Sequence, residues 1–333
     1  MPRCHTLRVG LLAACLSVAG LGLAAQPARA VSWDLYVYNS VATIPSVRGV
    51  ARIAEKIDTD TNHGLQIRMH LGGSLQINVT TITQAVGDGV IQMADDGFFA
   101  GSIPIGDVPR LPMLIRSQEE YAKIAPIMDK YISAAYAKRG VIMLGSYVYP
   151  VQVGFARKKY TSLADLRGLK MRVTSPEQGE FVKRFGGIPI TMGPPEVPAA
   201  LDRGVIDGVF TASAGAGYPW KDLLKYNYRL GVNYVNSYIV VNKAAFDALS
   251  PELQAAVRKA VTEVAPTITT DMLAEEDRLT QKMADGGMVV TPGTDADAAE
   301  GAKRMESLWD EWAKAHGPDG IAAVAAVRAA LGR

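Results

Sequence analysis

The sequence predicts an α/β protein of two lobes, each with a mostly parallel central sheet flanked by helices, and a long helix spanning both lobes. The chain has 333 residues, of which 48% are apolar, and a chain of this length forms two hydrophobic cores more readily than one. Strand and helix patterns alternate in two regions, which begin at Asp34 and near residue 155. Such alternation is typical of parallel strands joined by right-handed crossovers. A helical pattern then runs from Ser250 to about Asp285, long enough to extend across both lobes.

The first alternation supplies one sheet and one edge of a binding site. It contains a predicted strand at 34–38, a helix at 45–58, a strand at 65–71, a helix at 80–86 and a strand at 90–94. Apolar residues alternate with polar ones in the strands and recur at helical spacing in the helices. Because ligands gather at the carboxyl ends of parallel strands, we expect Asn39, Asp95 and Phe98 close to a ligand.

The second alternation follows the same order. It contains a short helix from Ser162 to Gly168, a strand at 169–173, a helix at 177–185, an extended segment at 188–190, a helix at 195–203 and a strand that begins within 204–209. Ser162 and Asp165 match a helix-capping pattern. In this pattern the serine side chain accepts a hydrogen bond from a backbone N–H of the first turn, and the acidic side chain accepts one from the backbone at the start of the helix. Ser250 and Pro251 mark the start of the long helix, and Pro266 predicts a kink in it.

The first 30 residues are typical of a secretory signal peptide. Arg3 and Arg8 precede an apolar run from Val9 to Ala25, and Ala28-Arg29-Ala30 supplies a cleavage motif. The apolar run is shorter than the roughly 20 residues of a membrane-spanning helix. We therefore expect cleavage after Ala30 and secretion. One alternative stays open, because Leu12–Cys15 matches the motif at which bacterial lipoproteins are cut and acylated on cysteine.

The expected mature chain is nearly neutral and has no cysteine. Cleavage removes three of the 35 basic residues and none of the 33 acidic ones, which leaves a net charge of −1. Such a chain lacks the basic patch of a nucleic-acid-binding protein. Cys4 and Cys15 both leave with the signal, so disulfides and cysteine nucleophiles are excluded.

An arginine at the end of a predicted strand is the most informative single residue. In the strand at 169–173, Lys170 and Arg172 share one face, while Met171 and Val173 share the other. One interpretation is an edge strand whose charges face water. The other makes Arg172 a planar fork that holds a carboxylate through two parallel hydrogen bonds.

Several segments resemble one known family. They read S-LADLRGLKMRV at 162–173, FGGIPITM at 185–192, PEVPAALDRGVIDG at 195–208 and YIVVNKAAFDALSPELQ at 238–254, with GGSLQ at 72–76. In this order and spacing they are similar to the TRAP transporter solute-binding proteins of DctP type. The resemblance covers nearly the whole mature chain. It implies a two-lobed periplasmic binding protein fold that closes around a small organic acid and delivers it to TRAP membrane permease subunits.

The resemblance also implies how the lobes are divided. We place lobe I at residues 31–153 and 238–282, and lobe II at residues 154–237 and 283–333, with the ligand cleft between them. We expect a monomer that binds no cofactor and no nucleic acid.

The family's ligand-binding residues carry over at some positions and change at others. The family arginine that grips the ligand carboxylate maps onto Arg172. Gln152 stands where many members have a second carboxylate-binding arginine. Thr211 stands where sialic acid binders have a ligand-binding asparagine. Phe210 and Thr211 replace the acid and tryptophan with which some keto-acid binders hold a metal, so we expect no metal.

With one cation and few polar partners, the ligand is expected to be a monocarboxylate with an aromatic or branched apolar body. Aromatic residues on segments that could border the cleft are Phe98, Phe99, Tyr147, Tyr149, Phe210, Tyr218 and Trp220. Each could equally serve packing in the core. Asp95 could accept a hydrogen bond from a ligand hydroxyl, or cap a turn.

The sequence carries no catalytic motif that would indicate an enzyme. His63, His70 and His316 show no metal-ligand spacing, and no G-x-S-x-G motif is present. Paired acids such as Glu275-Glu276 have the pattern of solvated helix faces. An enzyme is therefore not expected, although a periplasmic hydrolase is the alternative of another class. A protein that presents its ligand to a sensor kinase or chemoreceptor would have the same fold, and the sequence does not separate it from a transport protein.

Overall fold

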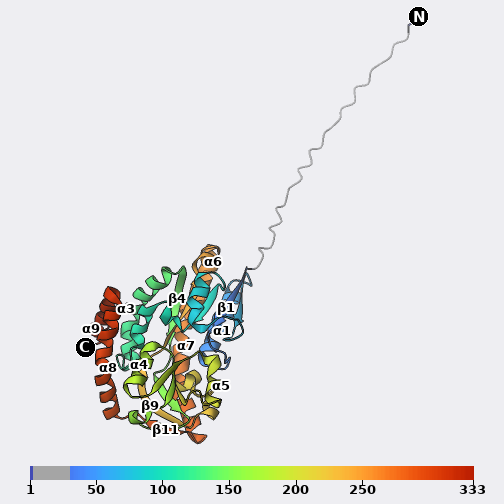
Figure 1. Cartoon of the computed structure of the whole chain (residues 1–333). Coiled ribbons are helices and arrows are strands. Elements are labelled where there is room, and N and C mark those ends of the chain that lie inside the picture. Colours follow the sequence, from blue (N-terminus) through green and yellow to red (C-terminus); the bar gives the residue numbers. More distant parts are fainter. Residues whose placement is uncertain (3–30) are drawn as a thin grey trace.

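The computed structural model describes residues 1–2 and 31–333, which build two sheets surrounded by helices (Figure 1). Apart from Met1 and Pro2, the predicted signal peptide lies outside the described residues, and so does the alternative acylation site at Cys15. In the part of the chain that the structure describes, no helix is both long and apolar enough to span a membrane.

The first sheet has five strands in the order β2-β1-β3-β10-β4. Its strands are β1 (Val31–Val37), β2 (Leu65–His70), β3 (Met93–Asp96), β4 (Val141–Val148) and β10 (Asn236–Asn242). β1 pairs in parallel with β2 and β3, while β10 is antiparallel to both β3 and β4. All strands of this sheet except β10 therefore run in one direction, which brings the carboxyl ends of β1 and β3 to the same edge.

The second sheet has six strands in the order β11-β9-β5-β8-β6-β7. Its strands are β5 (Gln152–Ala156), β6 (Lys170–Val173), β7 (Ile188–Thr191), β8 (Gly208–Thr211), β9 (Tyr226–Asn233) and β11 (Val289–Pro292). Only β5 in this sheet runs against its neighbours. The strand of Arg172, β6, lies between β7 and β8. The interpretation of β6 as an edge strand is therefore wrong.

Helices flank both sheets (Figure 1). The α-helices are α1 (Pro45–Asp60), α2 (Ile82–Gly87), α3 (Gln118–Ala137), α4 (Pro176–Arg184), α5 (Val197–Asp202), α6 (Lys243–Asp247), α7 (Pro251–Asp285), α8 (Asp295–Ala315) and α9 (Gly317–Ala330). Short 3-10 helices are η1 (Val79–Thr81), η2 (Phe99–Gly101), η3 (Pro104–Arg110), η4 (Leu163–Leu166), η5 (Pro194–Glu196) and η7 (Lys221–Leu223), and η6 (Ser213–Gly217) is a π-type turn.

The helix α7 runs alongside both halves of the molecule (Figure 1). It begins as its sequence predicts, since Ser250 accepts a hydrogen bond from the backbone N–H of Leu253 and Pro251 opens the first turn. The helix continues through Pro266 to Asp285 without interruption. It packs on α1 and β4 of the first half and on the η6 turn of the second.

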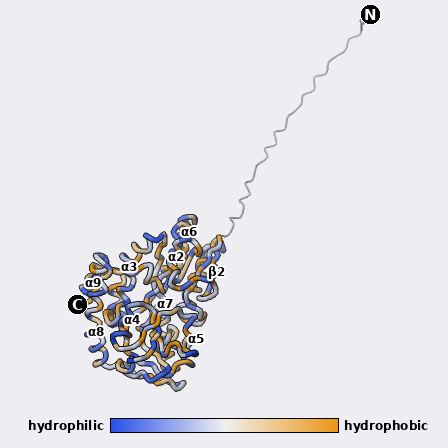
Figure 2. Tube along the Cα trace, viewed as in Figure 1, coloured by the Kyte–Doolittle hydropathy of each residue, from blue (hydrophilic) through white to orange (hydrophobic). Residues whose placement is uncertain are grey.

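Close packing between α1 and α7 requires a glycine. A Cβ atom on Gly49 would lie 2.4 Å from Cγ1 of Ile268 in α7, which no ordinary contact allows. The neighbouring residues Val50, Ile53 and Ile57 are fully buried. Figure 2 shows the apolar residues concentrated inside both halves, where the sheets and helices meet. The buried apolar residues of both halves form one continuous cluster, and α7 packs on both halves.

The chain also crosses between the sheets at residues 149–151 and 234–235. These two crossings lie side by side, because the backbone N–H of Tyr149 donates to the carbonyl of Val235 at 2.8 Å. Together with α7 they form the connections between the halves.

The third predicted strand is shifted along the chain. It spans Met93–Asp96 rather than 90–94, because Leu35 of β1 pairs with Met93 and Val90 lies in the preceding turn with 65% of its surface exposed. Asp95 consequently lies within the strand instead of beyond its end.

The predicted cap before η4 forms only in part. The Ser162 side chain accepts no backbone hydrogen bond. Its hydroxyl donates instead to the Asp165 carboxylate at 3.2 Å, and the same carboxylate accepts from the backbone N–H of Thr161 at 2.9 Å. The Asp165 carboxylate therefore accepts a hydrogen bond from a preceding backbone N–H, as predicted. The Ser162 hydroxyl donates to this carboxylate and accepts no backbone hydrogen bond, so the predicted serine cap does not form.

Candidate ligand-binding site

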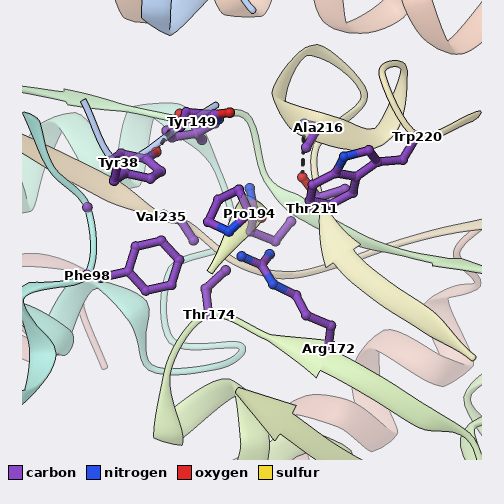
Figure 3. A pocket seen from close by; sticks show the side chains of 13 residues that line it. Tyr38, Phe98, Tyr149, Arg172, Thr174, Pro194, Thr211, Ala216, Trp220 and Val235 are labelled. Carbon is purple, nitrogen blue, oxygen red and sulfur yellow. Dashed lines mark hydrogen bonds between the residues drawn. The ribbon is translucent and has the colours of Figure 1, made fainter. Parts of the chain in front are cut away.

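A cavity lies between the two sheets, where the carboxyl ends of their parallel strands meet (Figure 3). It contains about 420 Å³ of empty space, a volume that includes the open solvent at its mouth. The lining residues are Tyr38, Asn39, Gly97, Phe98, Tyr149, Gln152, Arg172, Thr174, Pro194, Thr211, Ala216, Trp220 and Val235. Residues that follow β1 and β3 thus face residues from β6 and β8 across the cavity.

Arg172 is a buried cation in this cavity and forms no ion pair with any of the described residues. Only 3% of its surface is exposed, and burial lowers the pKa of its guanidinium to about 10. Its Nε donates to the carbonyl of Met192 at 3.0 Å, and Nη1 reaches the carbonyl of Phe210 only at 3.5 Å. Among residues 31–333, no carboxylate lies within 4.0 Å of it. A buried charge of this kind needs an anion to offset its lost hydration.

A second buried arginine, Arg110, is engaged by the protein through two of its three nitrogens, while its Nη1 has no hydrogen-bond partner among the described residues. Arg110 is fully buried, and its Nε donates to Oδ1 of Asn236 at 2.7 Å. Its Nη2 donates to the carbonyl of Gly97 at 2.9 Å, and its guanidinium lies 4.1 Å from the centre of the Phe99 ring. Arg110 therefore supports the cavity wall at Gly97 from behind, while Arg172 has donors left for a ligand.

Aromatic rings flank Arg172 on two sides. Its guanidinium carbon lies 5.9 Å from the ring centres of both Phe98 and Trp220, within reach of a cation–π attraction. Tyr38 packs edge-on against Phe98, with the ring centres 5.4 Å apart. A Cβ atom on Gly97 would lie 2.5 Å from the Tyr38 ring, so only glycine permits this arrangement. The cavity therefore combines one cation with flat apolar walls.

Hydroxyl groups form a small cluster at the wall that the first sheet contributes. The hydroxyls of Tyr38 and Tyr149 lie 2.5 Å apart, and the Ser46 hydroxyl lies 2.8 Å from that of Tyr149. Burial is the largest effect on Tyr38 and raises its pKa well above the usual value. The cluster is therefore neutral at ordinary pH, and it can donate or accept hydrogen bonds.

Three further polar side chains of the cavity are partly engaged by the protein. Asn39 uses its Oδ1 to accept from the backbone N–H of Val41, and Gln152 uses its Nε2 to donate to the carbonyl of Pro150. The second polar atom of each amide can serve a ligand. The Thr211 hydroxyl accepts from the backbone N–H of Ala216 at 3.2 Å (Figure 3), so it supports the wall as well as facing the cavity.

The structure brings six of the eight predicted site residues into this cavity. They are Arg172, Thr211, Gln152, Phe98, Asn39 and Tyr149. Phe210 is not in the lining, because its ring points into the core, where it packs edge-on against Phe181 with the ring centres 6.0 Å apart.

Asp95 also lies outside the lining, behind the cavity wall. Its carboxylate accepts from the Tyr147 hydroxyl at 2.9 Å and from the hydroxyl of Ser237. Burial raises the pKa of Asp95 to about 7, and the charge of the adjacent Asp96 adds to this rise. Tyr147 packs against the cavity residue Tyr149, with ring centres 5.7 Å apart. Asp95 is therefore one layer removed from the site.

Some lining residues were not predicted from the sequence. Tyr38 is the last residue of the predicted strand at 34–38, and Thr174 follows the predicted strand at 169–173. Both could have been predicted, as Asn39 was, from their position at the carboxyl end of a strand. No local pattern marks Pro194, Ala216 or Val235, because they enter the cavity through turns and crossings whose course depends on the tertiary fold.

The described residues also bear on metal binding. In residues 1–2 and 31–333, no three side chains of histidine, cysteine, aspartate or glutamate are grouped as metal ligands would be. That the ligand binds without a metal stays a prediction.

Comparison with known proteins adds independent findings. A family model described as bacterial extracellular solute-binding protein, family 7, matches residues 38–315. Over 295 residues the chain is 25% identical to the C4-dicarboxylate-binding periplasmic protein DctP of Rhodobacter capsulatus. The matched region covers 86% of this chain and 87% of that protein.

Solved structures match almost end to end. One is DctP7, a Bordetella pertussis extracytoplasmic solute receptor that binds pyroglutamic acid, with 25% identity and a TM-score of 0.84 over 90% of this chain and 100% of that chain. Another is a marine metagenome TRAP solute-binding protein specific for pyroglutamate, with 24% identity and a TM-score of 0.83 over 90% of this chain and 99% of that chain. The two-lobed α/β fold predicted from the sequence is thereby confirmed.

Proposed function

Because the chain belongs to the bacterial extracellular solute-binding proteins of family 7, the DctP type that serves TRAP transporters, we propose that it captures a small organic monocarboxylate between its two sheets. The family is the one that the sequence predicts, and it makes the protein a binding protein rather than an enzyme. We further propose that the protein works in the periplasm after loss of residues 1–30 and delivers its ligand to the membrane subunits of a TRAP permease.

The single observation that carries this proposal is the state of Arg172. Its guanidinium is 3% exposed, and no carboxylate of the described residues lies within 4.0 Å of it. Since an unpaired buried charge is costly, a site of this kind is stabilised when a ligand brings the opposite charge. The planar guanidinium can bind both oxygens of a ligand carboxylate at once.

The remainder of the cavity favours one carboxylate and a compact, flat or branched body. Arg172 is the only arginine or lysine among the lining residues, so a second carboxylate would be buried without a cation. By the family resemblance of the sequence, Gln152 stands where many members have another arginine. Phe98 and Trp220 offer ring faces to the ligand body. DctP7, at 25% identity, binds pyroglutamic acid, a ring with a single carboxylate, and this supports a compact cyclic acid.

Capture is proposed to occur by hinge closure without chemistry. We place lobe I at residues 31–153 and 238–282, and lobe II at residues 154–237 and 283–333. The cavity takes its walls from both sheets, so separating the lobes would open it to solvent. The two adjacent crossings at 149–151 and 234–235, together with α7, are the places where bending can occur.

A panel of acids tests the proposed function. We expect pyroglutamate, benzoate or 3-methyl-2-oxobutanoate to raise the melting temperature of the purified protein, and calorimetry to give one site per chain. Succinate and glucuronate should have weaker effects, because the first brings a second charge and the second a polar body. A protein that prefers succinate, or that converts any of these acids to a product, would refute the proposal.

A further inference from the structure

The η6 turn forms one wall of the cavity but has no large side chain to fix it. Its sequence is Ser213-Ala214-Gly215-Ala216-Gly217, and Ala216 and the following Trp220 line the cavity. Gly215 leaves the helical range with φ −76° and ψ −106°. Because small residues offer little packing, the position of such a turn depends on its hydrogen bonds.

Glu276 of α7 holds the start of this turn. Its Oε1 accepts from the backbone N–H of Ser213 at 3.1 Å, and its Oε2 accepts from that of Ala214 at 2.8 Å. Only 7% of Glu276 is exposed, so the prediction that Glu276 belongs to a solvated helix face is wrong. The carboxylate faces the turn because α7 packs against η6.

A partly buried ion pair keeps the Glu276 carboxylate in place. Arg229 of β9 donates through Nη2 to Oε1 of Glu276 at 3.0 Å. Its Nη1 donates to the hydroxyls of Ser213 at 3.1 Å and Thr280 at 3.0 Å. These four side chains therefore connect α7, β9 and η6 in one network, and none of the four lines the cavity.

On its cavity side the same turn touches ligand-facing groups. The backbone N–H of Ala216 donates to the Thr211 hydroxyl at 3.2 Å. A Cβ atom on Gly215 would lie 3.1 Å from that hydroxyl and 3.5 Å from Cδ1 of Tyr149. The turn thus fills the space between the Glu276 network and two residues of the cavity wall, so a shift of the turn would change the cavity directly.

We propose that Glu276 is a positioning residue for ligand binding, which fixes the η6 turn so that Ala216 and Trp220 stand in place before the ligand arrives. The inference rests on the function proposed for the cavity. Its physical basis is preorganisation, since a wall that is already ordered loses less conformational freedom when the ligand binds. Glu276 itself does not touch the ligand.

The variant Glu276→Gln tests this role, with Glu275→Gln as its matched control. The amide keeps one acceptor oxygen but turns an NH2 group toward a backbone N–H or Arg229, so the turn loses part of its support. The adjacent Glu275 makes ion pairs with Arg48 and Arg278, and among the described residues it forms no hydrogen bond with the turn. The same change of charge thus occurs one residue away, without the effect on η6.

Two measurements decide the inference. Hydrogen exchange in the ligand-free protein should become faster at the amides of Ser213, Ala214 and Ala216 in Glu276→Gln and stay unchanged in Glu275→Gln. The Kd for pyroglutamate should rise about tenfold or more in Glu276→Gln and stay near wild type in the control. A lower melting temperature with an unchanged Kd would mean that Glu276 only stabilises the fold, and would overturn the inference.

The outcomes separate this inference from the proposed function. If wild-type protein binds none of the panel acids, the proposed function fails, and the positioning role for ligand binding fails with it. If wild-type protein binds pyroglutamate but exchange at η6 is the same in Glu276→Gln as in wild type, the proposed function stands and the positioning role alone is refuted.

Discussion

The guanidinium carbon of Arg172 lies 5.9 Å from the centre of the Phe98 ring, and the two residues belong to different sheets. Arg172 is in β6 of the second sheet, whereas Phe98 lies two residues after the end of β3 of the first. The pair therefore spans the cavity. A ligand carboxylate bound at Arg172 places the body of the ligand against a wall from the opposite sheet, so recognition of the charge and closure of the lobes involve the same contact.

Replacing Arg172 with alanine is expected to abolish most of the binding. The ligand carboxylate would then be buried without a cation, which costs about 3–5 kcal/mol. Calorimetry with the best acid of the panel measures the loss. Lys170→Ala is the matched control, since Lys170 lies two residues earlier in β6 and its Nζ donates to the carbonyl of Gly204 outside the cavity. Near wild-type affinity in Arg172→Ala would contradict the assignment.

Replacing Arg172 with methionine should stabilise the ligand-free protein while removing binding. Methionine fills a similar volume without a charge, and replacing buried ion pairs by well-packed apolar side chains is often neutral or adds about 1–4 kcal/mol of stability. Urea unfolding without ligand measures the change. A ligand-free variant that is less stable than wild type would show that the contacts with Met192 and Phe210 outweigh the cost of burying the charge.

Introducing an arginine at Gln152 should shift the preference toward dicarboxylates. Gln152 lines the cavity and is 3% exposed, so Gln152→Arg places a second cation where a second ligand carboxylate can pair with it. The ratio of succinate affinity to benzoate affinity should rise by about tenfold, which corresponds to about 1.4 kcal/mol. Gln152→Met controls for the loss of the amide. An unchanged ratio would place residue 152 outside the reach of the ligand.

The Asp95 carboxyl group should make stability fall as pH rises toward neutral. Burial raises its pKa from 3.8 to about 7, so the folded protein binds a proton that the unfolded chain releases. Below pH 3.8 both states are protonated and nothing is lost. Between pH 3.8 and about 7 folding becomes less favourable, and above about 7 the loss is complete.

Asp95→Asn removes this titration. The difference in unfolding free energy between Asp95→Asn and wild type should therefore move in favour of the variant from pH 4 to pH 8, as measured by denaturant unfolding at each pH. Glu275→Gln, which changes an acid whose side chain is 28% exposed, serves as a control. A difference that does not vary with pH would show that Asp95 is ionised throughout this range.

The site was only partly accessible to sequence reasoning. Asn39 and Phe98 could be placed at strand ends because the alternation of strands and helices is a local pattern. Asp95 was misplaced, because the register that pairs Leu35 with Met93 is set between strands and not within one. Gln152 and Thr211 came from the family resemblance, as did the choice of Arg172 over a solvated edge charge.

The sequence by itself determined the order of the elements, the long helix and the family, because periodicity, helix caps and motif spacing are properties of neighbouring residues. Only the tertiary structure decided which side chains are buried together. Arg172 is enclosed because β7 covers its strand, and Glu276 is buried because η6 packs on α7. Burial depends on which distant segment covers a residue, so two acids as alike as Glu275 and Glu276 have different surroundings.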